Sequence, residues 1–212
     1  MKLHWGPHTC AIGIQVLLEE AGAKYESAQL DVSGGETHTP AFLAINPKGK
    51  VPTLVRDDGS VLTEFGAIAT WIARKFPTAG LLPPDAKSEA RVTEIMEYVE
   101  GTVHGQGFGR IFNPARFEPQ EMLHGKAGLG RSSVEKQGRE MVQAGFAILD
   151  RQLAGKAYAA GSSLSIADAA LFYVEWWAPA KDIPLPGNLR RHLDQMLARP
   201  SVRTVLTLWG ES

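Results

Sequence analysis

Residues 77–86 read PTAGLLPPDA, and this stretch divides the 212-residue chain into two parts of different character. Three prolines and one glycine fall within these ten positions. Proline has no N–H to donate inside a helix and glycine weakens a helix, so no helix runs through the stretch. We therefore expect a linker here, between a first domain at residues 1–76 and a second at residues 87–212.

The part before the linker alternates strand signals with helix signals. The expected elements are a strand at 3–5, a helix from the cap Thr9 to Gly22, a strand at 25–32, a short helix around 42–45, strands at 53–55 and 61–62, and a helix at 64–76. The β-α-β start implies a parallel strand pair. Asp57-Asp58-Gly59 between the last two strands predicts a hairpin, which adds an antiparallel edge to a small α/β unit.

The part after the linker is nearly all helix. Apolar residues at helical spacing predict helices at 87–103, 133–153, 169–177, 189–197 and 202–209. Ser165 and Asp168 form a capping-box pattern before the third of these helices. The glycines from Gly105 to Gly109 indicate a helix kink or a pocket loop. The predicted fold class is therefore an α/β domain followed by an all-α helical bundle.

Composition excludes several classes of function. The chain has 22 basic and 23 acidic residues, a net charge of -1, which argues against a nucleic-acid binder and a polybasic membrane-surface protein. No apolar run approaches the roughly 20 residues of a membrane helix, and Met1–Leu18 does not read as a signal peptide. The single cysteine excludes an intrachain disulfide and predicts a cytoplasmic location. His124 and His192 have no partner at ligand spacing, so no metal is expected.

Cys10 is the strongest candidate for chemistry. It lies at the start of the first predicted helix, where unpaired N–H groups and the positive end of the helix dipole favour a thiolate. It also follows a strand directly, at the edge where open α/β sheets bind ligands. We therefore predict a lowered pKa for this thiol, with a small buried apolar residue as the alternative interpretation.

Two further places can hold a ligand. Val51-Pro52 precedes the hairpin, and a cis peptide bond there would turn the Val51 backbone toward a ligand. Glu64-Phe65-Gly66 begins a helix, where bare N–H groups can bind an anion and the carboxylate can accept an ammonium group. The alternative for Glu64 is ordinary pairing of an acid with the helix dipole.

Four ordered motifs resemble the glutathione transferase family over essentially the whole chain. They are Gly6-Pro7-His8-Thr9-Cys10, the run from Asn46 to Leu54, Leu62-Thr63-Glu64 with Ala67-Ile68, and Leu164-Ser165-Ile166-Ala167-Asp168. Cys10 and Phe112-Asn113-Pro114-Ala115 look most like the bacterial beta class. The resemblance implies a thioredoxin-like N-terminal domain, a C-terminal helical domain and a homodimer with a role in detoxification.

The resemblance also implies a role for particular residues. Cys10 would meet the sulfur of glutathione, the co-substrate, and no metal would take part. The implied glutathione-binding residues are Thr9, Cys10, Val51, Pro52, Glu64 and Phe65. The implied pocket for the second substrate, a small electrophile or disulfide, is formed by Trp5, His104, Phe108 and Phe112. Glutathione conjugation and thiol exchange on glutathione mixed disulfides both fit this arrangement.

Two departures from the family pattern keep another reading open. Phe65 stands where the family usually has a serine, and Glu36 lies in a loop where the beta class tends to carry a lysine. A non-catalytic binding protein on the same scaffold is therefore the alternative, and retention on immobilised glutathione separates the two. A glutathione-dependent isomerase or dehalogenase fits less well, because no serine-rich motif lies between Trp5 and Ile12.

Overall fold

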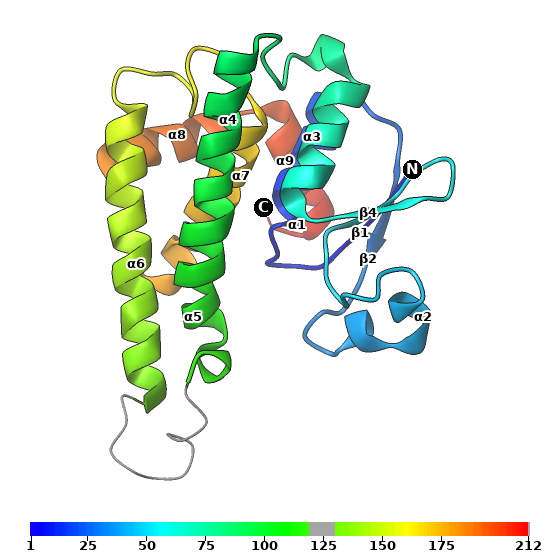
Figure 1. Cartoon of the computed structure of the whole chain (residues 1–212), viewed down its shortest axis with the longest axis horizontal. Helices are drawn as coiled ribbons and strands as arrows, with labels where there is room; N and C mark the ends of the chain where they lie inside the picture. The colour runs from blue at the N-terminus through cyan, green and yellow to red at the C-terminus, as the bar shows by residue number, and fades with distance from the viewer. Residues whose placement is uncertain (119–129, 212) are drawn as a thin grey trace.

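A four-stranded sheet with helices forms the first part of the molecule, and the described residues of the second part are helical (Figure 1). The structure is a computed structural model that describes residues 1–118 and 130–211. The strands are β1 (Lys2–Trp5), β2 (Glu26–Gln29), β3 (Thr53–Val55) and β4 (Val61–Thr63). The helices are α1 (Ala11–Glu20), α2 (Pro40–Leu43), α3 (Phe65–Lys75), α4 (Ala86–Tyr98), α5 (Gly109–Phe112), α6 (Gly130–Leu153), α7 (Ile166–Trp177), α8 (Gly187–Leu197) and α9 (Pro200–Trp209). The predicted fold class is confirmed.

The sheet has the strand order β2-β1-β3-β4. β1 pairs with β2 in parallel, and β3 pairs with both β1 and β4 antiparallel, so the predicted parallel pair and hairpin are confirmed. β2 is shorter than predicted and ends at Gln29, because the N–H of Val32 turns back to the carbonyl of Leu30. α2 begins one residue after Thr39, whose side-chain oxygen caps it.

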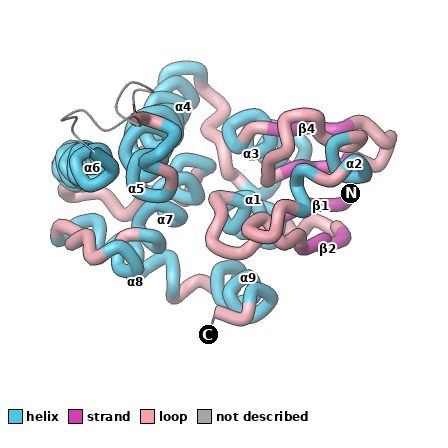
Figure 2. Tube along the Cα trace, turned by 90° about the horizontal axis from the view of Figure 1, so that it is seen from below, coloured by secondary structure: helices cyan, strands magenta, loops and turns pink. Residues whose placement is uncertain are grey.

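α1 is the central helix that joins the two parts. It packs against α3, α7 and α9, and Figure 2 shows it between the strands and α7. All residues from Ala11 to Leu18 are buried, which is why this helix has no polar face. A Cβ on Gly13 would lie 2.6 Å from the carbonyl oxygen of Ala169, so only glycine lets α1 and α7 approach this closely. The start of α1 is thereby fixed at the boundary between the two parts.

One long helical segment runs from α4 to α5 and contains a π-helix, Val99–Phe108. The segment ends at Asn113, before Pro114. The glycines at 105–109 belong to this helical run, which favours the predicted kink over a loop. Gly107 faces α6, where a Cβ would lie 2.7 Å from Cγ2 of Val142, so this glycine permits the close contact between the two helices.

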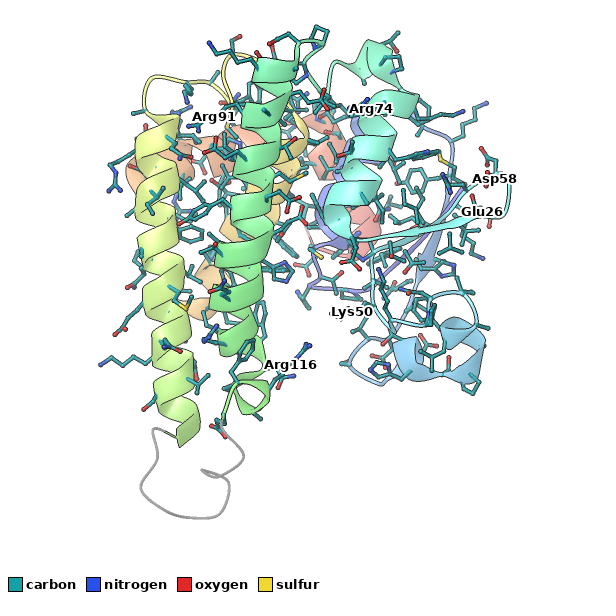
Figure 3. All side chains as sticks on the ribbon, viewed as in Figure 1. Glu26, Lys50, Asp58, Arg74, Arg91 and Arg116 are labelled. Carbon is teal, nitrogen blue, oxygen red and sulfur yellow. The ribbon has the colours of Figure 1, made fainter. Side chains whose placement is uncertain are left out.

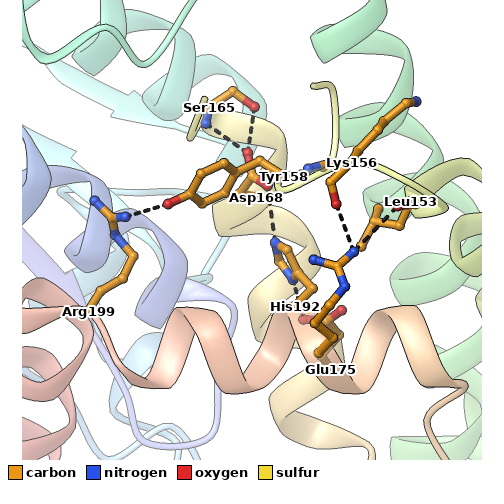
Figure 4. Close-up of polar contacts among 10 residues, drawn as sticks. Leu153, Lys156, Tyr158, Ser165, Asp168, Glu175, His192 and Arg199 are labelled. Carbon is orange, nitrogen blue, oxygen red and sulfur yellow. Dashed lines mark hydrogen bonds and ion pairs between the residues drawn. The ribbon is translucent and has the colours of Figure 1, made fainter. Parts of the chain in front are cut away.

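A buried charged network ties α7 to α8 (Figure 4). The predicted capping box forms, with Asp168 accepting hydrogen bonds from the N–H and hydroxyl of Ser165 at 2.7 and 2.8 Å. His192 lies 2.7 Å from Glu175 and 3.1 Å from Asp168, and all three side chains are fully buried. The sequence did not indicate these two ion-pair partners of His192. Burial lowers its pKa, but the charges and hydrogen bonds of Glu175 and Asp168 prevail and raise it to about 10.

No helix among the described residues is long and apolar enough to cross a bilayer. Among the same residues, no group of three or more His, Cys, Asp or Glu side chains is placed to hold a metal ion. His124 lies outside the residues that the structure describes.

Candidate active site

A cleft of about 550 Å³ opens between the sheet and the helical part, and Cys10 lines it as predicted. The sheet side contributes Cys10, Asn46, Lys48, Lys50, Val51, Pro52, Thr63, Glu64 and Phe65. The helical side contributes Glu100, His104, Gly105, Gly109, Phe112, Asn113, Arg116 and Phe117. Residues from three separate predicted motifs therefore meet at one place.

Cys10 occupies the N-cap position of α1, one turn after the end of β1. Thr9 does not cap this helix, because its hydroxyl donates instead to the carbonyl of Gly6 at 2.7 Å. Thr9 is also absent from the residues that line the cleft, so only its neighbour Cys10 faces the space where a ligand can bind. The turn thus places the sulfur, and not the threonine hydroxyl, at the cleft wall.

The predicted lowering of the Cys10 pKa is wrong. Burial, followed by the negative charge of Glu100, raises the pKa of this thiol from 9.0 to about 12. The backbone N–H of Cys10 and the charge of Lys50 act in the opposite direction, but they are too weak to prevail. In the ligand-free protein the thiol is therefore protonated at neutral pH, and it can donate its S–H to an anionic ligand.

This protonation state predicts slow reaction of Cys10 with disulfide reagents. A pKa rise from 9.0 to about 12 lowers the thiolate fraction at neutral pH about a thousandfold. A more basic thiolate is more nucleophilic, so we expect a net rate about 50-fold below that of N-acetylcysteine with dithiobis(nitrobenzoate). The measurement is stopped-flow absorbance at pH 7.5, with the urea-unfolded chain as control. A folded-state rate equal to the unfolded one would contradict the raised pKa.

Val51 and Pro52 line the cleft beside Cys10. The Val51-Pro52 peptide bond is cis, as predicted. Asn46 is almost fully buried and holds this loop from behind, since its amide donates to the Lys50 carbonyl at 2.8 Å and the Thr53 hydroxyl at 2.9 Å. Asn46 belongs to the quoted motif, but the sequence did not indicate this positioning role.

Glu64 is held in an unusual backbone conformation at the cleft. It is the N-cap residue of α3 and has a φ of 69°, a left-handed value that costs a non-glycine residue of order 1–3 kcal/mol. Its carboxylate accepts a hydrogen bond from Nζ of Lys48 at 2.6 Å, and the same Nζ donates to the Thr63 hydroxyl at 2.8 Å. The sequence did not indicate this pairing, although Lys48 lies in a quoted motif.

The Phe65 side chain is directed into the core. It is 5% exposed and packs edge-to-face on Tyr173, with 5.2 Å between ring centroids. The departure from serine at this position therefore serves packing between α3 and α7. Glu36, the second departure, is absent from the cleft lining, and its carboxylate accepts the N–H of Asp31 at 2.6 Å.

Glu100 is a cleft residue that the sequence did not single out. Burial, followed by the charge of Glu97, raises the pKa of Glu100 to about 8. Its Oε1 lies 3.4 Å from the position of a Cβ on Gly66, so the carboxyl group sits against the start of α3. The only sequence feature that indicated burial of Glu100 is its place beside the apolar positions Val99 and Val103 on a predicted helix.

Two of the four residues expected in the second-substrate pocket line the cleft. Nδ1 of His104 lies 3.1 Å from the Tyr173 hydroxyl, and burial lowers the pKa of His104 to about 4, so its ring is neutral. Phe112 is 44% exposed on the cleft wall and contacts Trp177 edge-to-face at 5.2 Å. A neutral imidazole and an open aromatic ring therefore stand across from Cys10.

The other two expected residues lie in the core, which corrects the prediction. Trp5 donates its indole N–H to the Ser27 hydroxyl at 2.7 Å and stacks on Trp209 at 4.4 Å, so its ring faces away from the cleft. Phe108 is fully buried and supports the wall from behind, stacked on Phe112 at 5.5 Å. Neither belongs to the cleft lining.

The chain matches known proteins along most of its length. One family model, described as "Glutathione S-transferase, N-terminal domain", matches residues 1–74, and another, "Glutathione S-transferase, C-terminal domain", matches residues 88–205. The chain is 29% identical to "Glutathione S-transferase GstA" of Escherichia coli over 99% of both chains.

Solved structures agree with these matches. A glutathione transferase homologue from Sulfitobacter, solved with bound glutathione, has a TM-score of 0.86 at 28% identity and covers 98% of this chain and 97% of its own. A bacterial beta class glutathione S-transferase from Sphingomonas chungbukensis has a TM-score of 0.83 at 29% identity over 100% of both chains.

Proposed function

The chain belongs to the glutathione S-transferase family, and we propose that this transferase conjugates glutathione to small electrophiles in the cleft that Cys10 lines. The observation that carries the proposal is the meeting of Cys10, Val51 and Glu64 around one cavity of about 550 Å³. These three residues come from separate motifs, and each supplies a different contact that a tripeptide needs.

Glutathione would extend along the sheet side of the cleft. Its γ-glutamyl ammonium would lie between the carboxyl groups of Glu64 and Glu100, and a cation bound there would favour ionisation of Glu100, whose pKa is raised by burial and by nearby acids. Its cysteinyl backbone would pair with Val51, and its glycyl carboxylate with Lys50. Lys50 would thereby replace the lysine that the beta class tends to carry in the loop where this chain has Glu36.

The sulfur of glutathione would face Cys10 at the start of α1. The reacting sulfur must be a thiolate, and three features favour that charge: the S–H of Cys10, the helix N-terminus and the Lys50 ammonium. The thiolate attacks the electrophilic carbon, a C–S bond forms, and the leaving group departs with its electron pair. The proton lost by glutathione goes to solvent.

Thiol exchange is the second candidate, favoured by a cysteine sulfur on the cleft wall. The Cys10 thiolate would attack the glutathionyl sulfur of a mixed disulfide and release the other thiol. A second glutathione thiolate would then free Cys10 and leave as glutathione disulfide. The raised pKa of Cys10 slows the first of these steps, and for this reason conjugation is the leading proposal.

The proposal is tested with glutathione and 1-chloro-2,4-dinitrobenzene, followed by absorbance. We expect a rate above the uncatalysed reaction that saturates with glutathione, together with retention on immobilised glutathione. Retention without turnover would support the non-catalytic binding protein instead. Absence of both would contradict a glutathione site in the cleft.

We also propose a homodimer, which rests mainly on the family. β4 is an edge strand of the sheet, and Val61 on it is 38% exposed, an apolar side chain that a partner can cover. Light scattering at micromolar concentration should give twice the chain mass of 23.0 kDa. A mass of one chain would contradict the dimer. The cytoplasmic location and the lack of nucleic-acid or membrane partners stay predictions.

A further inference from the structure

The cleft contains more positive charge than its acidic residues balance. Lys48, Lys50 and Arg116 all line it, and Lys48 is paired with Glu64. Within residues 1–118 and 130–211, neither Lys50 nor Arg116 has a side-chain hydrogen bond or ion pair. Figure 3 shows them on opposite sides of the gap, with Arg116 on the helical side and its side chain extended into the gap.

The acids in the cleft do not neutralise Arg116. Glu64 is already paired with Lys48, and it lies with Glu100 near the start of α3. The pKa of Glu100 is raised to about 8, so this group carries little negative charge at neutral pH. If the glycyl carboxylate of glutathione pairs with Lys50, Arg116 is the cation without an acidic partner among the described lining residues.

Arg116 stands beside an aromatic surface. Phe112 and Phe117 line the same end of the cleft, and Phe112 is 44% exposed. The Phe112 ring is held in place by Phe108 and Trp177, with centroid distances of 5.5 and 5.2 Å. Nζ of Lys181 lies over the Phe112 ring, 5.2 Å from its centroid, and the guanidinium of Arg110 lies over the Phe117 ring at 4.6 Å. The exposed part of the Phe112 ring can still contact a flat aromatic ligand.

We propose that the second substrate is an aromatic electrophile that carries a carboxylate or sulfonate, with its ring against Phe112 and Phe117 and its anionic group on Arg116. This inference rests on the proposed conjugation of glutathione. A planar guanidinium binds a carboxylate or sulfonate through paired N–H groups, which fixes the ring as well as its charge. Arg116 is therefore a specificity-determining residue.

The test compares two substrates that differ only in charge. They are 4-chloro-3,5-dinitrobenzoate and its methyl ester, which share the ring and the leaving group. In both reactions the glutathione thiolate forms the C–S bond, chloride leaves with its electron pair, and the thiol proton goes to solvent. The wild-type chain is compared with Arg116→Gln and with Arg151→Gln, an exposed arginine in the last turn of α6 and absent from the cleft lining.

We expect Arg116→Gln to lower kcat/KM for the benzoate about tenfold, the size of one lost charge-assisted contact, and to leave the ester within about twofold. Arg151→Gln should leave both substrates unchanged. In the wild type, KM for the benzoate should rise with ionic strength while KM for the ester stays constant. The dependence of KM on ionic strength tests the inference even if Arg116→Gln does not fold.

The outcomes separate the inference from the function on which it rests. Equal losses for benzoate and ester in Arg116→Gln, or a benzoate KM insensitive to salt, would overturn the inference while conjugation stands. Turnover of neither substrate by the wild type would overturn the proposed function and the inference together.

Discussion

Changing Cys10 to alanine should abolish thiol exchange on glutathione mixed disulfides and slow conjugation roughly 100-fold, the lower end of the cost of one lost oxyanion-type donor. Exchange through the protein ends because the chain has no other cysteine. Conjugation persists at a reduced rate because the attacking sulfur belongs to glutathione. The α1 N-terminus and Lys50 still favour its negative charge. Both activities are measured on the same preparations.

The matched control is Cys10→Ser, which keeps a donor of similar size at the same place. We expect this variant to conjugate within about tenfold of the wild type, since a hydroxyl also donates a hydrogen bond to a thiolate. Its exchange activity should be absent, as in Cys10→Ala. Unchanged conjugation in Cys10→Ala would show that Cys10 does not contact the glutathione sulfur.

Changing His192 to asparagine should lower the free energy of unfolding by about 3–5 kcal/mol, the cost of leaving a buried charge without its partner. Glu175 and Asp168 lie 2.7 and 3.1 Å from this ring, and all three side chains are fully buried. The measurement is urea unfolding at pH 8, because burial raises the pKa of Glu175 to about 7 and the carboxylate is ionised beside His192 only above that pH. The control is His8→Asn at an exposed turn with a φ of 58°, which asparagine tolerates, so its effect should stay within about 0.5 kcal/mol.

The His192 network also predicts how stability depends on pH. The folded-state pKa of His192 is about 10, above the ordinary 6.5, so its stabilisation is complete below about pH 6.5 and is lost as the pH rises toward 10. The wild type should therefore lose free energy of unfolding between pH 6 and pH 9.5 more steeply than His192→Asn. Equal slopes in the two proteins would contradict an imidazolium at this position.

Local sequence signals predicted the features that depend on neighbouring residues. The Ser165–Asp168 capping box and the hairpin around Asp57-Asp58-Gly59 each form within a few positions of the chain, and both are confirmed. Cys10 was also placed correctly on the cleft, because a residue just after a strand and before a helix lies at the ligand edge of such a sheet.

The sequence could not predict properties that arise where distant elements meet. The pKa of Cys10 is raised by burial under the helical part and by Glu100, which lies on the segment after α4. The sequence pattern could not predict that Phe108 lies on the buried face of its helix, because a π-helix interrupts the 3.6-residue periodicity there. The partners of His192 depend on how α8 packs on α7, and Arg116 follows a helix end that has no periodic signal.

A crystal structure with glutathione soaked in tests whether the cleft holds glutathione with its sulfur against Cys10. We expect the tripeptide along Val51, with its γ-glutamyl end at Glu64 and Glu100 and its sulfur in contact with Sγ of Cys10. Glutathione bound with its sulfur away from Cys10, or a cleft without glutathione at a saturating concentration, would contradict the proposed contact between the two sulfur atoms.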